Sequence, residues 1–297
     1  MSARHHPDPQ GLLLAVGAYV IWGVLPVYFH LLAEVPSLQL LAHRVVWSVL
    51  LLVPLVALLG RAGAIRQAAR GRTLLLLAAS ATLIALNWLV YIWAVQHGHV
   101  LEASLGYFIN PLVNVALGVL LLGERLRRFQ ALAIVIAASG VLVMTVEGGG
   151  SIVISIALAV TFGVYGLLRK IAAIDSLGGL TVETLLLAPL AAGWLGYSAA
   201  QGESGFGHST GHDLMLLAAG VVTATPLLMF AAAARRLPLS MMGLLQYIAP
   251  TLQFLLALAF GEPLRTVHLI AFPLIWGGCA LYAWDSIRAT RIIQPKG

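Results

Sequence analysis

Several side chains that can carry charge stand inside long apolar stretches of this sequence. The run "QLLAHRVVWSVLLLVPL", residues 39–55, holds His43 and Arg44 among aliphatic residues. An arginine at the centre of a membrane helix costs about 2.5–3.5 kcal/mol on insertion scales. Arg44 therefore either reaches back to the outer lipid headgroups or faces a water-filled outer vestibule, where it attracts solutes. Gln39, His43 and Trp47 recur every four residues beside Arg44, and this polar stripe favours a cavity wall.

A second group of polar residues shares faces of predicted helices near mid-span. Asn110 and Asn114 lie four residues apart, on the face of Tyr107, and Gln246 and Gln253 share a face of a later helix. Polar faces at this depth must point into the bundle. There they either line a cavity or join helices at about 0.6 kcal/mol per hydrogen bond, and both interpretations stay open. The candidate substrate-binding residues are Trp22, His43, Arg44, Asn87, Tyr91, Tyr107, Asn110, Asn114, Gln246, Tyr247 and Gln253.

Glu183 is the acidic residue that lies well inside a predicted span. It and Arg44 each lie only about 7–8 Å deep, from opposite faces of a core about 30 Å thick, which leaves roughly 15 Å between them. We therefore expect no salt bridge between the two. Glu183 either titrates and couples transport to protons, or reaches the inner headgroup region, and its depth favours the headgroups.

Motifs for catalysis are weak. The segment "HSTGHD", residues 208–213, matches a short acyltransferase pattern but lacks a second element of such an enzyme. Gly148 to Gly150 are not followed by the Lys and Ser/Thr that a phosphate-binding loop requires. The sequence predicts no catalytic residue, no metal site and no cofactor.

Composition indicates a membrane protein. Of 297 residues, 60% are hydrophobic and only 9% are charged, against about 25% charged in soluble domains. The single cysteine, Cys279, excludes an internal disulfide. The net charge of +6 bears on membrane topology and does not point to a nucleic-acid partner.

Ten stretches are long and apolar enough to span a bilayer, which takes roughly 20 residues. We therefore predict an all-α, polytopic membrane protein in contact with lipid. The ten predicted spans cover residues 11–32, 39–59, 73–96, 102–122, 130–146, 151–168, 178–200, 213–233, 239–260 and 266–284.

The distribution of positive charge predicts the orientation. With the N-terminus inside and ten spans, 15 of the 17 Lys and Arg residues fall in inner segments, and only Arg265 lies in an outer loop. This asymmetry follows the positive-inside rule. Both termini and the 61–72 loop are therefore predicted to be cytoplasmic.

The two halves of the chain repeat each other weakly. Trp22 of "WGV" recurs as Phe162 of "FGV", and Tyr107 recurs as Tyr247, both at an offset of 140 residues. Pro111 and Pro250 interrupt matched helices, and "GERLR" at 123–127 recurs as "GEPLR" at 261–265. We predict two five-helix repeats, 1–147 and 148–297. Because five is odd, the second must be inverted, a plan that secondary transporters use with a site at mid-membrane.

These segments resemble a known family. "AYVIWGVLPVYF", "HRVVWS", "NWLVYIWAV", "ASLGYFINPLVNVALGVLLLGERL" and "QYIAPTLQFLLA" are similar to the RarD branch of the EamA-type drug/metabolite transporter superfamily, over about residues 11–284. The resemblance implies a ten-helix permease of the inner membrane with both termini cytoplasmic. RarD proteins carry the label "chloramphenicol-sensitive", but the resemblance names no physiological substrate.

The residues and the resemblance together predict a permease that moves small solutes by alternating access. Arg44 would favour anionic or zwitterionic solutes. An intramembrane lipid- or acyl-modifying enzyme is the alternative from another class. It would need a convergent nucleophile and base, and His43, Arg44 and Glu183 are too dispersed. A structural membrane partner without transport activity is the other alternative, and the repeat argues against it.

Overall fold

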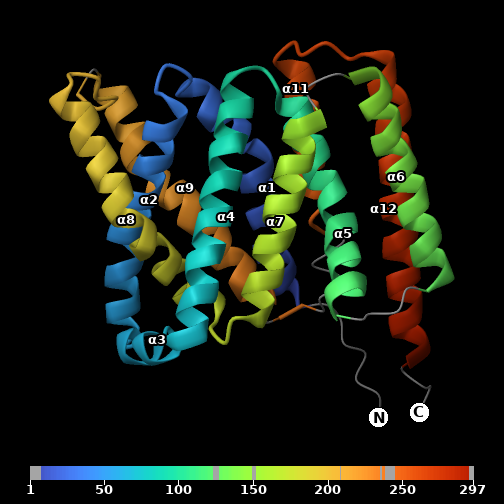
Figure 1. Cartoon of the computed structure of the whole chain (residues 1–297), viewed down its shortest axis with the longest axis horizontal. Helices are drawn as coiled ribbons and strands as arrows, with labels where there is room; N and C mark the ends of the chain where they lie inside the picture. Colours follow the sequence, from blue (N-terminus) through green and yellow to red (C-terminus); the bar gives the residue numbers. More distant parts are fainter. Residues whose placement is uncertain are drawn as a thin grey trace.

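The chain is described by a computed structural model that covers residues 8–122, 127–148, 152–207, 209–234, 236–237 and 245–293. Within these residues the secondary structure is entirely helical (Figure 1). The helices are α1 (Pro9–Leu31), α2 (Ser37–Leu58), α3 (Ala62–Ala68), α4 (Gly71–Gln96), α5 (Val100–Leu122), α6 (Arg128–Gly148), α7 (Ile152–Ile171), α8 (Ser176–Ala200), α9 (Thr210–Ala234), α11 (Ile248–Ala259) and α12 (Thr266–Ile293).

The helices are apolar enough to cross a membrane. Six of those described have the required length and composition: α1, α2, α4, α8, and the segments Ile152–Arg169 of α7 and Thr210–Phe230 of α9. Shorter apolar segments lie in α6, α11 and α12. Large side chains such as Leu58 and Leu190 are 85% and 75% exposed, as expected where lipid replaces water. The protein is therefore a multi-pass membrane protein.

The predicted spans agree with these helices to within a few residues at most ends. The span expected at 239–260 is described only from residue 245, and α11 begins at Ile248. The loop at 61–72 contains the short helix α3, which lies at the same end of the bundle as the start of α1 and the end of α12 (Figure 1). We call this the α3 end. The number of spans and the two inverted repeats stay predictions.

Local sequence signals explain where several helices begin and end. Asp8 accepts a hydrogen bond from the Gln10 backbone N–H at the start of α1, and Asp175 does the same for Gly178 at the start of α8. At the opposite end of the bundle, Gly261 follows α11 with a φ of 83°, a left-handed conformation that favours glycine. This turn directs Glu262 to the start of α5.

The helices pack in a regular set of pairs. Helix α2 packs against α8 and α9, α1 against α9 and α11, and α7 against α4 and α5. Helices α6 and α12 pack mainly on each other at one edge of the bundle (Figure 1). A Cβ on Gly140 would lie 2.9 Å from the Ala271 carbonyl oxygen, and one on Gly278 would lie 2.6 Å from that of Ala133. Small residues therefore let these two helices approach closely.

Candidate functional site

A cavity of about 350 Å³ opens among the helices. Its walls come from α1, α2, α4, α5, α7, α8, α9 and α11, so both halves of the chain contribute. Ligand sites for small molecules usually have volumes of about 300–1,000 Å³. The lining reaches Arg169, Ser176 and Leu177, where α7 ends and α8 begins at the α3 end. The cavity therefore extends from the middle of the bundle toward the α3 end.

Six of the predicted site residues line the cavity: Trp22, Arg44, Tyr91, Tyr107, Gln246 and Gln253. Four other predicted residues are not part of its lining: His43, Asn87, Asn110 and Tyr247. Asn114 belongs to α5, but its side chain lies outside the described residues.

Arg44 is buried, with 4% of its surface exposed. Its Nε donates to Thr223 Oγ1 at 3.0 Å, and its guanidinium carbon lies 4.6 Å from the Trp88 ring centroid and 5.2 Å from that of Phe29. Such cation–π contacts strengthen when desolvated. The explanation that Arg44 reaches the headgroups was therefore wrong, because the Thr223 bond and the two rings hold it inside the bundle. Among the described residues no carboxylate forms a salt bridge with it.

Asn87 supports the cavity from behind. Its Nδ2 donates to the Leu158 carbonyl at 3.0 Å and to Thr161 Oγ1 at 2.9 Å. Its Oδ1 accepts from the Tyr107 hydroxyl at 3.2 Å. Asn87 is fully buried and thus joins α4 to α7 while it orients Tyr107, which does line the cavity.

Gln253 has a fixed orientation in the cavity wall. Its Nε2 donates to the Trp22 backbone carbonyl at 3.1 Å. Since only the nitrogen of a side-chain amide can donate, this bond determines which atom is the oxygen. The Gln253 Oε1 is buried and has no hydrogen-bond partner among the described residues.

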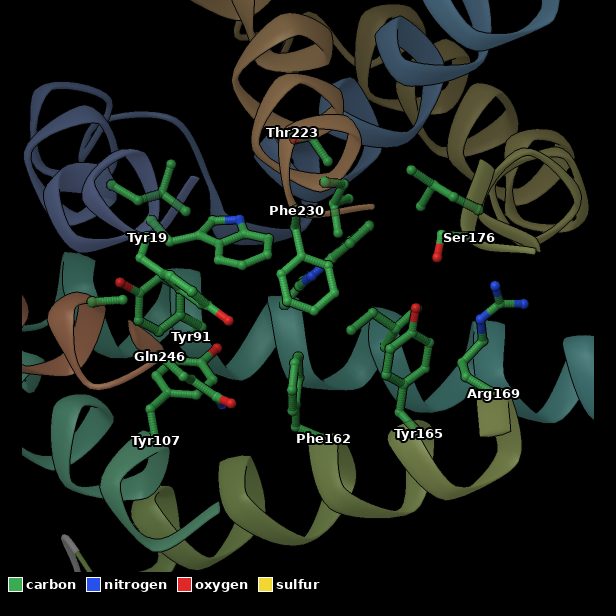
Figure 2. Close-up of a pocket in the computed structure, with 18 of the residues that line it drawn as sticks. Tyr19, Tyr91, Tyr107, Phe162, Tyr165, Arg169, Ser176, Thr223, Phe230 and Gln246 are labelled. Atoms are coloured by element: carbon green, nitrogen blue, oxygen red, sulfur yellow. The ribbon is translucent and has the colours of Figure 1, made fainter. Parts of the chain in front are cut away.

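Eight aromatic side chains of the described residues line the cavity; Trp88 contacts Arg44, and the other seven form two groups. The first aromatic wall, from α1 and α9, consists of Tyr19, Trp22 and Phe230. The second aromatic wall, from α4, α5 and α7, consists of Tyr91, Tyr107, Phe162 and Tyr165. Ring centroids lie 5.7–6.1 Å apart within the first wall and 5.5–6.0 Å apart within the second. In Figure 2, Phe162 and Phe230 face each other across the middle of the view.

Glu183 does not reach the headgroup region, which corrects the sequence-based interpretation. It is 1% exposed and accepts from Ser80 Oγ at 2.5 Å and from the Tyr165 hydroxyl at 3.4 Å. Its Oε1 lies 3.6 Å from Arg169 Nε. The depth of Glu183 along its helix could not predict this partner, because Arg169 belongs to α7 and reaches α8 only through tertiary packing. We expected no salt bridge between Glu183 and Arg44, and Glu183 pairs with Arg169 instead.

Arg169 lies on the backbone of α8. A Cβ on Gly179 would come within 1.7 Å of Arg169 Nη1, so only glycine leaves room for the guanidinium in this place. Arg169 Nη2 also donates to the Asp175 carbonyl at 3.0 Å. Asp175 in turn pairs with Arg61, just before α3. These contacts tie α7, α8 and the α3 segment together beside the mouth of the cavity.

The opposite end of the bundle is joined by hydrogen bonds outside the cavity lining. Gln39 Nε2 donates to the Glu203 carbonyl at 2.6 Å, and Gln39 Oε1 accepts from the Gly205 N–H at 2.9 Å. His43 accepts at Nδ1 from Trp47 Nε1 at 3.3 Å and stacks on Phe206. The Gln39 bonds and the His43–Phe206 contact link the start of α2 to the loop after α8, and none of these three residues lines the cavity.

Glu262 makes a further link at the opposite end. Its two carboxylate oxygens accept from the backbone N–H groups of Val100 at 2.6 Å and Leu101 at 2.8 Å, at the start of α5. Burial raises the pKa of Glu262 to about 7, although these two N–H groups lower it, and nearby Glu102 raises it further. The carboxyl therefore titrates near neutral pH.

Sequence reasoning missed several lining residues. Phe162 could have been predicted as a lining residue, because it is the repeat counterpart of Trp22. Arg169 had been counted only as a positive charge of an inner loop. Trp88 and Phe230 carry no distinguishing signal in the sequence, since an aromatic residue in an apolar helix usually packs in the core.

Comparisons with known proteins relate this chain to one family of membrane transporters. The profile of the EamA-like transporter family matches residues 9–146. An uncharacterized transporter of Pseudomonas aeruginosa is 47% identical over 292 residues, covering 97% of this chain and 98% of the relative. Protein RarD of Escherichia coli K12 is 45% identical over 285 residues, 95% of this chain and 96% of that one.

More distant matches agree. The chloramphenicol-sensitive protein RarD of Pseudomonas aeruginosa is 36% identical over 301 residues, covering 97% of this chain and 98% of the relative. A solved crystal structure that is 21% identical covers 92% of this chain and 96% of its own, with a TM-score of 0.62. At that identity the likeness concerns the fold. The family and the relative of Pseudomonas aeruginosa that is 47% identical are named as transporters.

Proposed function

The chain belongs to the RarD branch of the EamA-like drug/metabolite transporters, and we propose that it carries small organic solutes across the membrane by alternating access. The observation that carries this proposal is the cavity of about 350 Å³ between the two halves of the chain, with Arg44 buried in its wall. A cavity of this size accommodates a metabolite or a drug-sized ligand.

The packing supports two inverted repeats as the basis of alternating access. In the two repeats α1 corresponds to α7, α2 to α8, α4 to α9, α5 to α11 and α6 to α12. The packing follows this correspondence, because α1 contacts α9 and α11 just as α7 contacts α4 and α5. The pairs α2–α8 and α6–α12 map onto themselves. In such transporters one half rocks against the other around a fixed site. The present cavity, which extends to the α3 end, corresponds to one of the two states.

The charges of the lining support an anionic or zwitterionic solute. Among the described residues that line the cavity, Arg44 and Arg169 are the charged side chains, and none is acidic. Fixed positive charge in a low-dielectric cleft raises the local concentration of anions. Arg44 is thus the proposed anion-binding residue, with His43 beside it toward the opposite end of the bundle.

Glu183 is the proposed coupling residue. It lies directly behind two lining residues, Arg169 and Tyr165, so a movement of α7 against α8 changes its contacts. Ionisable residues inside membrane bundles often form proton relays. Under this proposal Glu183→Gln keeps solute binding but loses the dependence of transport on a pH gradient, measured in proteoliposomes with acid inside or outside. Unchanged dependence contradicts the role of Glu183 alone.

The orientation is part of the proposal: the α3 end faces the cytoplasm of the inner membrane, and both termini lie there. The positive charge near α3 supports this orientation, and Arg66 on α3 is exposed. In a Cys279→Ala background, Arg66→Cys should resist an impermeant maleimide in intact cells and react after permeabilisation. Labelling in intact cells contradicts the orientation.

An unbiased comparison of culture media tests transport itself. Cells that produce the wild-type protein are compared with cells that produce Leu228→Trp, which fills the cavity. Leu190→Trp, a substitution of the same size on the exposed face of α8, is the matched control. We expect at least one solute whose concentration changes with the wild type and the control but not with Leu228→Trp, at equal membrane abundance. The proposal fails if Leu228→Trp acts like the wild type.

A further inference from the structure

Four buried polar atoms of the cavity-lining residues have no hydrogen-bond partner among the described residues. One of them, Arg169 Nη1, belongs to the guanidinium that pairs with Glu183 at the α3 end. The other three are not part of an ion pair in the described part of the chain. They are Arg44 Nη1, Gln253 Oε1 and the Tyr91 hydroxyl, on side chains that are 4%, 3% and 3% exposed. Buried polar groups are nearly always satisfied, and each exception calls for an explanation. Because Arg44, Tyr91 and Gln253 line one cavity, a single ligand there would provide hydrogen-bond partners for all three atoms.

The chemistry of two of these atoms is fixed. Arg44 Nη1 is a charged donor, and a guanidinium is suited to a carboxylate through paired N–H groups. Gln253 Oε1 is an acceptor, since the Gln253 Nε2 already donates to the Trp22 carbonyl. The ligand must therefore offer an anionic acceptor to Arg44 and an N–H or O–H donor to Gln253. The Tyr91 hydroxyl can serve either as donor or as acceptor.

The two aromatic walls define the rest of the ligand. They present the rings of Trp22 and Phe230 on one side of the cavity and those of Tyr107 and Phe162 on the other. Aromatic side chains hold flat rings by stacking and edge contacts, which add to the burial of apolar area. A cationic ligand is disfavoured because the described lining contains no acidic side chain.

We propose that the solute is a small aromatic acid that also carries an N–H or O–H group. Its carboxylate binds Arg44, its donor binds Gln253, and its ring lies between the two aromatic walls. This inference rests on the proposed function and names the chemical class of the solute for the same cavity.

Binding to the purified protein tests the three features separately. Isothermal titration compares indole-3-acetate with indole-3-acetamide, which lacks the charge, with 1-methylindole-3-acetate, which lacks the donor, and with 4-hydroxycyclohexaneacetate, which keeps a donor but lacks the aromatic ring. We expect the amide to bind about tenfold more weakly or worse, and each of the other two about fivefold more weakly. Equal affinity for the acid and the amide, or for the aromatic and the saturated acid, overturns the proposal.

Two variants assign the contacts to residues. Arg44→Gln should bring the ratio of acid to amide affinity close to one, and Gln253→Leu should do the same for the ratio of indole-3-acetate to its 1-methyl derivative. Each variant should keep the other preference, which a general loss of folding would not produce. Arg66→Gln, which removes an exposed charge that is not part of the cavity lining, should keep both. A variant that loses both preferences together, or neither, contradicts the assignment.

The outcome is distinguishable from failure of the proposed function. If none of the four probes binds while the comparison of media finds a solute that depends on an open cavity, the aromatic-acid class is wrong and transport stands. If the comparison also finds no such solute, the proposed function fails with it.

Discussion

Arg44 and Glu183 occupy matched places in α2 and α8, two helices that pack against each other, yet their surroundings differ. Both side chains are buried, and each bonds to a hydroxyl of a neighbouring helix, Arg44 to Thr223 and Glu183 to Ser80. Glu183 has a guanidinium 3.6 Å away, whereas Arg44 has no carboxylate partner among the described residues. A buried charge with a partner can serve the structure alone. A buried charge without one weakens the fold, and a ligand of opposite charge explains its presence.

Breaking the paired charge should have the largest effect on stability. Glu183→Leu leaves Arg169 without its carboxylate, while Ser80 keeps only the Leu77 carbonyl as an acceptor, so we expect a loss of about 3 kcal/mol in the free energy of unfolding. The double variant Arg169→Leu/Glu183→Leu removes both charges and should recover most of this loss. Chemical unfolding in detergent measures both. A double variant as unstable as the sum of its single variants contradicts the pairing.

A substitution of Gly179, which lies against the Arg169 guanidinium, tests the Arg169–Glu183 pair in another way. Gly179→Ala places a methyl group where the guanidinium lies and should push Arg169 away from Glu183, with a loss of about 2 kcal/mol. Gly193→Ala on the same helix meets open space and should instead stabilise by roughly 0.5–1 kcal/mol, as alanine does in helices. Thermal unfolding compares the two variants. If Gly179→Ala is as stable as Gly193→Ala, the place assigned to Arg169 is wrong.

The smallest predicted effect concerns Glu262. Its pKa is raised from 4.5 to about 7, mainly by burial, so ionisation is less favourable in the folded state than in the unfolded chain. Its stabilising contribution is therefore complete below about pH 4.5 and is lost as the pH rises through 7. Glu262→Gln should reduce the fall in unfolding temperature between pH 5 and 8 by about 1–2 °C.

A matched control separates this titration from a general loss of acidic charge. Glu203→Gln removes an exposed carboxyl from the same end of the bundle and should keep the wild-type pH dependence. Parallel pH profiles for the wild type and Glu262→Gln would show that the Glu262 carboxyl does not titrate in this range.

The helices could be predicted from the sequence because each depends on local signals. The apolar run at 39–59 became α2, Ser37–Leu58, and the turn residues at 201–212 mark the end of α8. Helical periodicity also identified lining residues such as Tyr91 and Gln253. These inferences need only the length and the 3.6-residue period of a helix.

The rotation and pairing of helices could not be read in this way. Tyr107 and Asn110 are three residues apart on α5, yet only Tyr107 lines the cavity, because the rotation of α5 depends on its neighbours. Depth along a helix likewise gave Glu183 a headgroup position, since the sequence holds no sign that Arg169 of α7 returns beside it. Contacts between distant segments are decided by tertiary packing.

The central claim is that Arg44 binds the solute, whereas Glu183 binds no solute and pairs with Arg169 behind the cavity wall. The most direct measurement is transport into proteoliposomes by Arg44→Leu, with its unfolding free energy determined on the same preparation. We predict a transport rate reduced by at least about tenfold and an unfolding free energy within about 1 kcal/mol of the wild type, because a charge without a partner is removed. Normal transport by Arg44→Leu, or a loss of stability as large as that of Glu183→Leu, would contradict the account.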